Sequence, residues 1–441
     1  MHSTLTNLKG YNIMNDSITM AARSRIKTKK QKGSDDSDSI GNGNNSANEE
    51  FTPSLLGNGD GELIEEDDDT IDLFSLEGEY VDAPSPPREA EKGQGDATRD
   101  KLTCSACAWK TFRCTLWLAF CIISLVVILL LVVAPLVIKV FPQIPKHIIY
   151  LNAFKIPYEV NLSDPRSVEL NYARHFYKHI EDNITVGVWH ILPKSLERDG
   201  LTDRDFESLL HSKHPVILYC HGNTGTRGTD HRVEMYKVLA ALDYHVVALD
   251  YRGYGDSTGS PTSENGVVTD VVTLYLWLRE KAGPDVPMYV WGHSLGTGIA
   301  TKAVRFLTEQ RKEYPKALFL ESPFNNIFDA AMLHPFSKIF GLLWWFDDLF
   351  LDAMHTYGIY LQNDVHILHI ELPVLIMHAE DDHVIPIELG LKLYNASKTR
   401  PKSFPPVIFH KFSKERGFQH KYIYSAQELP NILGNFLKGI N

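Results

Sequence analysis

Residues 288–304, MYVWGHSLGTGIATKAV, decide the fold that we expect for this chain. An apolar run leads to Gly292, and a run that suits a helix follows Gly296. Ser294 lies between these glycines, which gives the pattern GxSxG at a strand-to-helix junction. A serine at such a turn has a strained backbone, and the glycines remove side chains that would collide with the strand and the helix. The stretch therefore predicts a serine hydroxyl exposed at the carboxyl edge of a parallel sheet.

The rest of the C-terminal region fits such a sheet, because strand-like and helix-like runs alternate from about residue 150. Continuous apolar strands separated by helices are typical of a mostly parallel sheet that helices cover on both faces. We therefore predict an α/β fold with a mostly parallel central sheet and helices on both faces. The predicted strands begin at Ile184, Pro215, His245, Pro287, Ala317, Pro373 and Pro405.

A serine hydroxyl is a weak nucleophile without a base, and the base needs an acid that orients it. In this topology the acid follows the serine along the chain and precedes the histidine. Glu380, Asp381 and Asp382 come directly after a predicted strand. We select Asp382, which is furthest from the strand and precedes a turn closed by Pro386, and Asp381 is the alternative.

The catalytic histidine should lie in a loop beyond the last strand. His420, in SKERGFQHKYIY, meets this condition. His410 belongs to the preceding strand, while His378 and His383 lie beside the acid, so we interpret these three as scaffold residues.

The oxyanion of a tetrahedral intermediate needs backbone donors. The amide of Leu295, which follows the nucleophile, is one candidate. The loop YCHGNTGTRG, residues 219–228, follows an earlier strand and should supply the other donor. We assign this second role to Asn223, with Thr224 as the alternative.

The net charge of −11 is unevenly distributed. Residues 34–100 contain 20 acidic and 3 basic side chains, and residues 1–33 contain 7 basic and 1 acidic. The acidic balance therefore belongs to the tail and says nothing about a substrate of the folded region. Residues 1–110 are polar and charged, which predicts a disordered acidic tail.

Residues 115–141, TLWLAFCIISLVVILLLVVAPLVIKVF, contain no charge before Lys139. As a helix they extend about 40 Å, enough to cross a hydrocarbon core of about 30 Å. We predict one transmembrane helix over these residues. Basic residues flank both ends in similar number, so charge does not decide the orientation.

Cys104 and Cys107 form a CxxC just before this segment, but no second pair or nearby histidine completes a zinc site. We interpret them as free thiols near a membrane, with S-acylation as the alternative. We expect no metal, no organic cofactor and no nucleic-acid partner.

Several motifs together resemble the α/β-hydrolase superfamily, and within it the membrane-anchored lysophosphatidylserine and monoacylglycerol lipases. The resemblance covers about residues 145–440 and the preceding span. It rests on HGNTG, DYRGYGDSTG, GHSLGTG, ESPF, HAEDDHVIP and HKYIY.

This resemblance implies a catalytic domain over 145–441, with Ser294, Asp382 and His420 on the triad positions. It also implies a single-pass protein of the endoplasmic reticulum membrane whose catalytic domain faces the lumen. A preference for lysophosphatidylserine comes from the resemblance alone. Glycosylation sequons beyond the span, at Asn161, Asn183 and Asn395, favour the same side, although Asn15 and Asn44 in the tail are also sequons.

Residues 325–371 occupy the position of a cap and are rich in aromatic and aliphatic side chains. They either pack as core or form a lid over an acyl-chain pocket near the membrane. In the second case Trp344, Trp345 and Phe346 line the pocket or contact lipid. Arg227 and Arg416 are candidates for binding an anionic head group.

The sequence thus predicts a membrane-anchored serine lipase that cleaves the acyl ester of lysophospholipids, and of monoacylglycerols, through an acyl-enzyme. Its expected partners are the lipid substrate and the bilayer. The alternatives are a serine peptidase or thioesterase on the same fold, or a catalytically silent membrane-tethered scaffold.

Overall fold

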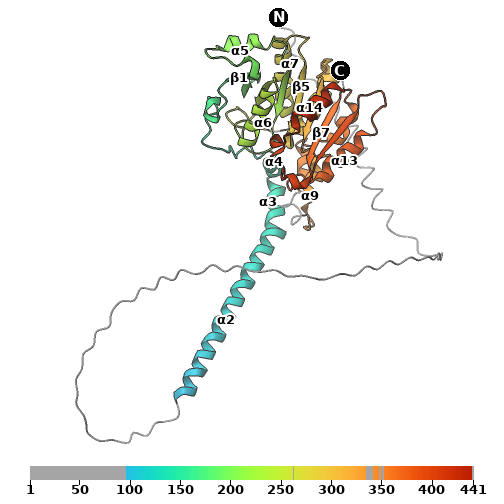
Figure 1. Ribbon diagram of the computed structural model, residues 1–441. Helices are drawn as coiled ribbons and strands as arrows, with labels where there is room; N and C mark the ends of the chain where they lie inside the picture. The colour runs from blue at the N-terminus through green and yellow to red at the C-terminus, as the bar shows by residue number, and fades with distance from the viewer. Residues whose placement is uncertain (1–95, 262, 334–340, 347–348, 350–351, 440–441) are drawn as a thin grey trace, which may run out of the picture. The chain divides into compact units, whose positions relative to one another are not determined.

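The computed structural model describes residues 96–261, 263–333, 341–346, 349 and 352–439, with the side chains of 96–107 excepted (Figure 1). Most of the tail predicted over 1–110 therefore lies outside the described residues. Residues 96–110 are already helical, so the predicted boundary of the tail was too far along the chain. The side chains of Cys104 and Cys107 also lie outside the described part.

A long apolar helix precedes the sheet. It consists of α2 (Asp96–Ile128), the π-helical turn η2 (Leu129–Val133) and α3 (Ala134–Val140). Among the described residues, only the stretch 108–140 is long and apolar enough to cross a bilayer. It contains nearly all of the predicted span, so the chain has one helix compatible with a single membrane crossing.

The π-helical turn has a local cause in Pro135. In the π register a carbonyl accepts from the amide five residues later, as Leu129 does from Ala134. The carbonyl of Leu130 would need the amide of Pro135, which has no hydrogen to donate. The indole Nε1 of Trp345 donates to this carbonyl instead, at 2.9 Å. A cap residue thereby satisfies a backbone acceptor of the apolar helix.

Within the described residues, eight strands form one sheet in the order β1-β2-β4-β3-β5-β6-β7-β8. The pairs β1–β2 and β2–β4 are antiparallel, and every other pair is parallel. The strands are β1 (Ala173–Glu181), β2 (Ile184–Ile191), β3 (Val216–Cys220), β4 (His245–Leu249), β5 (Met288–His293), β6 (Ala317–Glu321), β7 (Val374–Ala379) and β8 (Val407–Phe412).

Helices cover both faces of this sheet. Val216 and Leu218 of β3 pack in one core with α7, α8 and α13, while Ile217 and Tyr219 pack in a second core with α6 and α14. The other helical segments are short. Bounds of the helices are α4 (Ile144–Tyr150), α5 (Asp203–Leu209), α6 (Asp230–Ala241), α7 (Glu264–Ala282), α8 (Leu295–Phe306), α9 (Ile327–Leu333), α11 (Asp352–Thr356), α12 (Asn363–His366), α13 (Ile387–Ser397) and α14 (Leu429–Lys438), with shorter turns η3 (Pro165–Val168), η4 (Lys194–Leu196), η5 (Leu307–Arg311), η7 (Ile367–His369), η8 (Lys414–Arg416) and η9 (Ile423–Ser425).

The predicted fold class is confirmed, including the mostly parallel sheet with helices on both faces. Strand β1 was not predicted, because its sequence ARHFYKHIE is largely polar. It lies at the edge of the sheet, where exposed side chains are tolerated. The insert between β6 and β7 contains α9, α11, α12 and η7.

A buried carboxylate fixes this insert to the helix layer. Oε2 of Glu264 accepts from the amides of Tyr360 and Leu361, at 2.7 and 2.8 Å. Nζ of Lys302 lies 2.9 Å from Oε1 of the same carboxylate. Burial opposes ionisation of Glu264, but the charges of Lys302 and His366 and the bonds to the carboxylate lower its pKa to about 2. The cap is therefore held by charge as well as by packing.

Candidate active site

Ser294 occupies the sharp turn between β5 and α8, with φ 53° and ψ −120°. Such a positive φ is strained for a residue with a side chain. A Cβ on Gly292 would lie 2.6 Å from the carbonyl oxygen of Gly296, and a Cβ on Gly296 would lie 2.1 Å from that of Cys220. Only glycine fits at these two positions, and this close approach fixes the turn that holds the serine.

Asp382 and His420 lie in contact beyond the ends of β7 and β8. The distance from Nδ1 of His420 to Oδ2 of Asp382 is 2.8 Å. The other oxygen of Asp382 accepts from the amides of Val384 and Ile385, at 2.9 and 2.8 Å. Burial would raise the pKa of Asp382, but the charge of His420 and hydrogen bonds with His378 and His420 hold it well below its usual value. An ionised, fixed carboxylate therefore faces the imidazole.

Asp381, the alternative acid, has a different position. Its Oδ1 accepts from the backbone amide of Gln419, at 3.0 Å. Asp381 thus holds the backbone of the loop that carries His420, whereas the imidazole of His420 is bound to Asp382. Nε2 of His378 lies 2.9 Å from the carbonyl oxygen of Ile385, inside the protein.

The loop of His420 lies against the nucleophile turn. Nε2 of His293, the residue before Ser294, donates to the carbonyl oxygen of His420, at 3.0 Å. The two rings also pack together at a tilt of 43°, with centroids 5.0 Å apart. Burial keeps the pKa of His293 well below its usual value, which suits a neutral ring that donates to a carbonyl. The contact brings the imidazole of His420 to the serine's side of the sheet.

The loop after β3 contacts the same turn. A Cβ on Gly222 would lie 3.3 Å from the Cβ of Ser294. Asn223 follows directly, and its side-chain oxygen accepts from the hydroxyl of Thr224 at 2.8 Å. Leu295 is the first residue of α8, so its amide has no acceptor within that helix. The predicted donors therefore lie on the two segments that flank the serine.

Sequence reasoning did not identify Arg232, which shapes this loop from inside the protein. Its guanidinium donates to the carbonyl oxygens of Gly222, Thr224 and Thr226, at 3.4, 2.5 and 2.7 Å. Arg232 thereby fixes the carbonyls of this loop, while the amides of Gly225 and Thr226 donate away from the serine, to the carbonyl oxygen of Phe154 and to Oγ1 of Thr229, both at 3.1 Å. Arg232 lies on α6, and only the spacing of basic residues after the glycine-rich loop could have suggested it.

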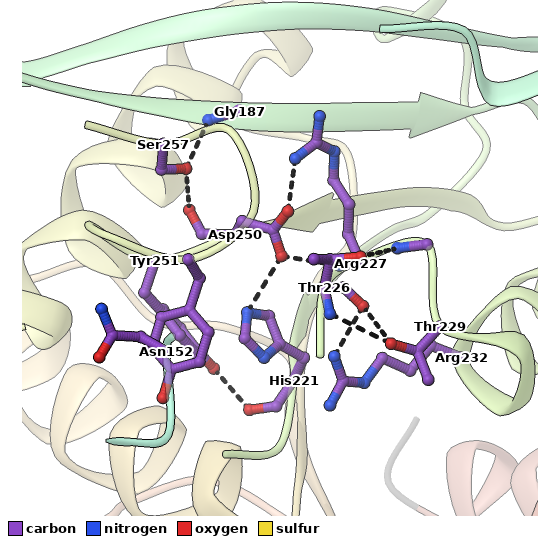
Figure 2. A network of polar contacts seen from close by, with 12 residues as sticks. Asn152, Gly187, His221, Thr226, Arg227, Thr229, Arg232, Asp250, Tyr251 and Ser257 are labelled. Atoms are coloured by element: carbon purple, nitrogen blue, oxygen red, sulfur yellow. Dashed lines mark hydrogen bonds and ion pairs between the residues drawn. The ribbon is translucent and has the colours of Figure 1, made fainter. Parts of the chain in front are cut away.

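Figure 2 shows a second support for the same loop, centred on Asp250. Its carboxylate accepts from the amide and Nη1 of Arg227, at 2.7 and 2.5 Å, and lies 3.3 Å from Nε2 of His221. Nη1 of Arg227 also lies 2.6 Å from Asp256. Burial opposes ionisation of Asp250, but Arg227 and His221 keep its pKa below the usual value. The network fixes both ends of the loop.

This network shows that the prediction of Arg227 as a head-group contact was wrong. The side chain is completely buried and ion-paired with two carboxylates. Arg416 is paired as well, with Glu428 at 2.9 Å. A basic residue in a loop is therefore insufficient to identify an anion site, because buried carboxylates compete for it.

The three aromatic cap residues also differ in environment. Trp345 and Phe346 are buried in the core, with 3% and 4% of their surface exposed. Trp344 is 71% exposed. Trp345 and Phe346 therefore follow the core-packing alternative, and their burial excludes them as lipid contacts.

A cavity of about 210 Å³ lies beside His420. Its lining residues are His383, Val384, Gln419, His420, Lys421 and Tyr422. In the described part of the chain, no group of three or more His, Cys, Asp or Glu side chains is arranged to hold a metal ion. The three predicted glycosylation sites beyond the span, Asn161, Asn183 and Asn395, are exposed.

The fold and this site define a serine ester hydrolase of the α/β-hydrolase class. The family model described as "alpha/beta hydrolase fold" matches residues 215–309. The lysophosphatidylserine lipase ABHD12 of Danio rerio is 44% identical over 361 residues, which are 81% of this chain and 90% of that protein. The lysophosphatidylserine lipase ABHD12 of Gallus gallus is 48% identical over 69% of this chain and 80% of that protein.

Protein ABHD12B of Homo sapiens is 35% identical over 68% of this chain and 81% of its own length. The chain therefore belongs to the α/β-hydrolase family and, within it, to the group of ABHD12 and ABHD12B proteins. Among solved structures, the esterase Pf2001 of Pyrococcus furiosus is 19% identical, with a TM-score of 0.47 over 65% of this chain and 97% of that one.

A further carboxyl group, that of Glu321, lies directly beneath the site. Its backbone oxygen accepts from the amide of Ser294 at 3.0 Å, and its side chain accepts from Nε1 of Trp291 at 2.9 Å. Burial raises its pKa from 4.5 to about 7, the bond from Trp291 opposes this shift, and the charge of Asp382 adds to it. Between about pH 4.5 and pH 7, Glu321 therefore takes up a proton when the protein folds.

A raised carboxyl pKa means that stability falls as the pH rises from about 4.5 through 7. We predict that Glu321→Gln, which keeps the acceptor for Trp291, removes this loss. Relative to the parent, the variant should gain up to about 3 kcal/mol at pH 8 and nothing comparable at pH 4.5. Thermal unfolding of the detergent-solubilised protein at both values measures the difference. Glu428→Gln at the exposed pair is the control, and an equal gain at both pH values would contradict the assignment.

Proposed function

We propose that this protein is a membrane-anchored lipase that cleaves the acyl ester of lysophospholipids, and of monoacylglycerols, with Ser294, His420 and Asp382 as its triad. The observation that carries the proposal is the 2.8 Å contact between Asp382 and His420, on a loop bound to the residue before Ser294. The names of the ABHD12 relatives support lysophosphatidylserine as the substrate class.

The reaction follows from these positions. Nε2 of His420 takes the proton of the Ser294 hydroxyl as its oxygen attacks the acyl carbonyl. The amides of Leu295 and Asn223 bind the resulting oxyanion. His420 then gives the proton to the leaving glycerol oxygen, which leaves an acyl-serine.

Water attacks this acyl-serine by the reverse sequence and releases the fatty acid. Asp382 keeps the proton of the imidazole on Nδ1 and stabilises the imidazolium that forms in both steps. Every proton that moves is returned, so the triad needs no other reactant than the ester and water.

We predict that Ser294→Ala abolishes labelling by a fluorophosphonate probe and hydrolysis of lysophosphatidylserine, because no other hydroxyl occupies the strained turn. Asp382→Asn should lower kcat roughly 10³-fold to 10⁴-fold, since the imidazole loses the acceptor that fixes its tautomer. Asp381→Asn is the matched control and should stay within about threefold of the parent. Labelling that persists in Ser294→Ala would exclude Ser294, and a larger loss in Asp381→Asn would move the acid to that position.

We also propose that the cap lies in the lipid leaflet beside the membrane helix. Trp345 donates to the carbonyl of Leu130. Along the helix, Leu130 lies about 14 Å before Lys139, the first charged residue after the apolar run. The neighbouring Trp344 and Leu342 are 71% and 87% exposed. Apolar side chains at that depth face hydrocarbon rather than water, so they would bring the cap to lipid substrates.

If so, Trp344→Ser should lower turnover of lysophosphatidylserine in vesicles about threefold to tenfold, because the cap loses apolar contact with lipid. Hydrolysis of a water-soluble p-nitrophenyl ester should be unchanged. Tyr314→Ser, at an exposed aromatic residue before β6, is the control for a general surface effect. A parallel loss on both esters would show that Trp344 acts on the site and not through lipid.

For the orientation, we propose a single crossing of the endoplasmic reticulum membrane with the catalytic domain in the lumen. The exposed sequons at Asn161, Asn183 and Asn395 support this side, because glycans are added there. Treatment of the full-length protein with an endoglycosidase should lower its apparent mass, and replacing the three asparagines by glutamine should remove that shift. If the protein carries no glycans at these three sites, and protease added outside sealed microsomes digests its catalytic domain, the domain faces the cytosol.

A further inference from the structure

The proposed reaction determines where the polar part of the substrate must lie. After acylation His420 donates its proton to the leaving oxygen, so the leaving alcohol must approach Nε2 of His420. In a lysophospholipid this alcohol is the glycerol that carries the phosphodiester head group. The head group therefore lies on the His420 side of Ser294, and the acyl chain lies on the other.

The cavity borders His420, the residue that the leaving alcohol must approach. It is lined by five residues besides His420 and has a volume of about 210 Å³. A water molecule occupies about 30 Å³ of liquid, so the cavity admits a polar group of several heavy atoms. Lys421, the residue after the catalytic histidine, contributes the cationic side chain of this lining.

Lys421 differs from three other basic side chains around the site. Arg227 and Arg416 are ion-paired, and Lys411 lies 2.5 Å from Glu380. Among the residues that the structure describes, no carboxylate pairs with Lys421, and its side chain is exposed. Its ammonium group is thus available for an anion without first breaking a bond within the protein.

We propose that this cavity is the head-group subsite, in which Lys421 binds the phosphodiester of a lysophospholipid and so favours it over a neutral monoacylglycerol. The inference rests on the proposed lipase function and adds the substrate-discriminating residue to it. A phosphodiester carries one negative charge at neutral pH, and a charged hydrogen bond from an ammonium to such an oxygen is stronger than a neutral one. A monoacylglycerol offers no charge at this position.

The test compares two esters of one fatty acid, oleoyl lysophosphatidylserine and 1-oleoylglycerol, in the same mixed micelles. With Lys421→Gln, kcat/KM for the lysophospholipid should fall about fivefold to tenfold, mainly through KM, because the lost contact exists before and during the reaction. The monoacylglycerol should change by less than about twofold. Lys411→Gln, which removes a nearby but paired lysine outside the cavity, should leave both esters unchanged.

Binding of the head group alone gives a second readout. Glycerophosphoserine, the leaving group without its acyl chain, should inhibit the parent enzyme competitively and inhibit Lys421→Gln several-fold less. Added salt should reduce the inhibition of the parent, since Lys421 is exposed and its charge is screened.

The outcomes separate the two proposals. If the parent cleaves lysophosphatidylserine and Lys421→Gln cleaves it equally well, or if both esters lose activity in parallel, the subsite is overturned while the lipase function stands. If the parent reacts with a fluorophosphonate but cleaves no lysophospholipid, the proposed substrate class is overturned and the subsite with it.

Discussion

The site depends on how closely the backbone of α8 approaches the end of β3. A single methyl group at Gly296 would lie 2.1 Å from the carbonyl oxygen of Cys220, so the contact exists only because that position has no side chain. The approach sets the first turn of α8 beside the loop after β3. Ser294 is strained at the same point, with a φ of 53° that the adjacent strand and helix impose. The position of Ser294 and the strain of its backbone thus have one cause.

Buried carboxylates organise the surroundings, and the balance between burial and the charges of their partners sets their pKa: burial raises that of Asp270 to about 6 even though Arg252 lies 2.7 Å away. Asp250 is bound by Arg227, Glu264 by Lys302 and Asp382 by His420, and each keeps a pKa below its usual value despite burial. Glu321 has no such cation, and its pKa is raised instead. As a result, one ionised carboxylate lies against the imidazole of His420, while Asp250 holds the loop after β3 and Glu264 holds the insert between β6 and β7. Removing a cation here would cost stability, since a lone charge would stay buried.

The contact between the apolar helix and the α/β domain also provides a donor for one polar group, the carbonyl of Leu130. Pro135 leaves the carbonyl of Leu130 without its donor in the π register, and a free carbonyl in an apolar environment is costly. Trp345 fills that role from the cap, which explains why this tryptophan is buried while Trp344 is exposed. A hydrogen bond therefore links the apolar helix to the insert between β6 and β7.

Local patterns in the sequence were sufficient for the apolar helix, for all but one strand and for the serine turn, because these depend on neighbours a few residues apart. They left Asp381 and Asp382 as alternatives for the acid, left core packing and lipid contact as alternatives for Trp345, and misjudged Arg227. What decides those cases is the partner of each side chain, which comes from a distant part of the chain: His420 for the acid, Asp250 for the arginine, Leu130 for the indole. Burial and charge compensation act between segments that only folding brings together, so the tertiary structure alone determined them.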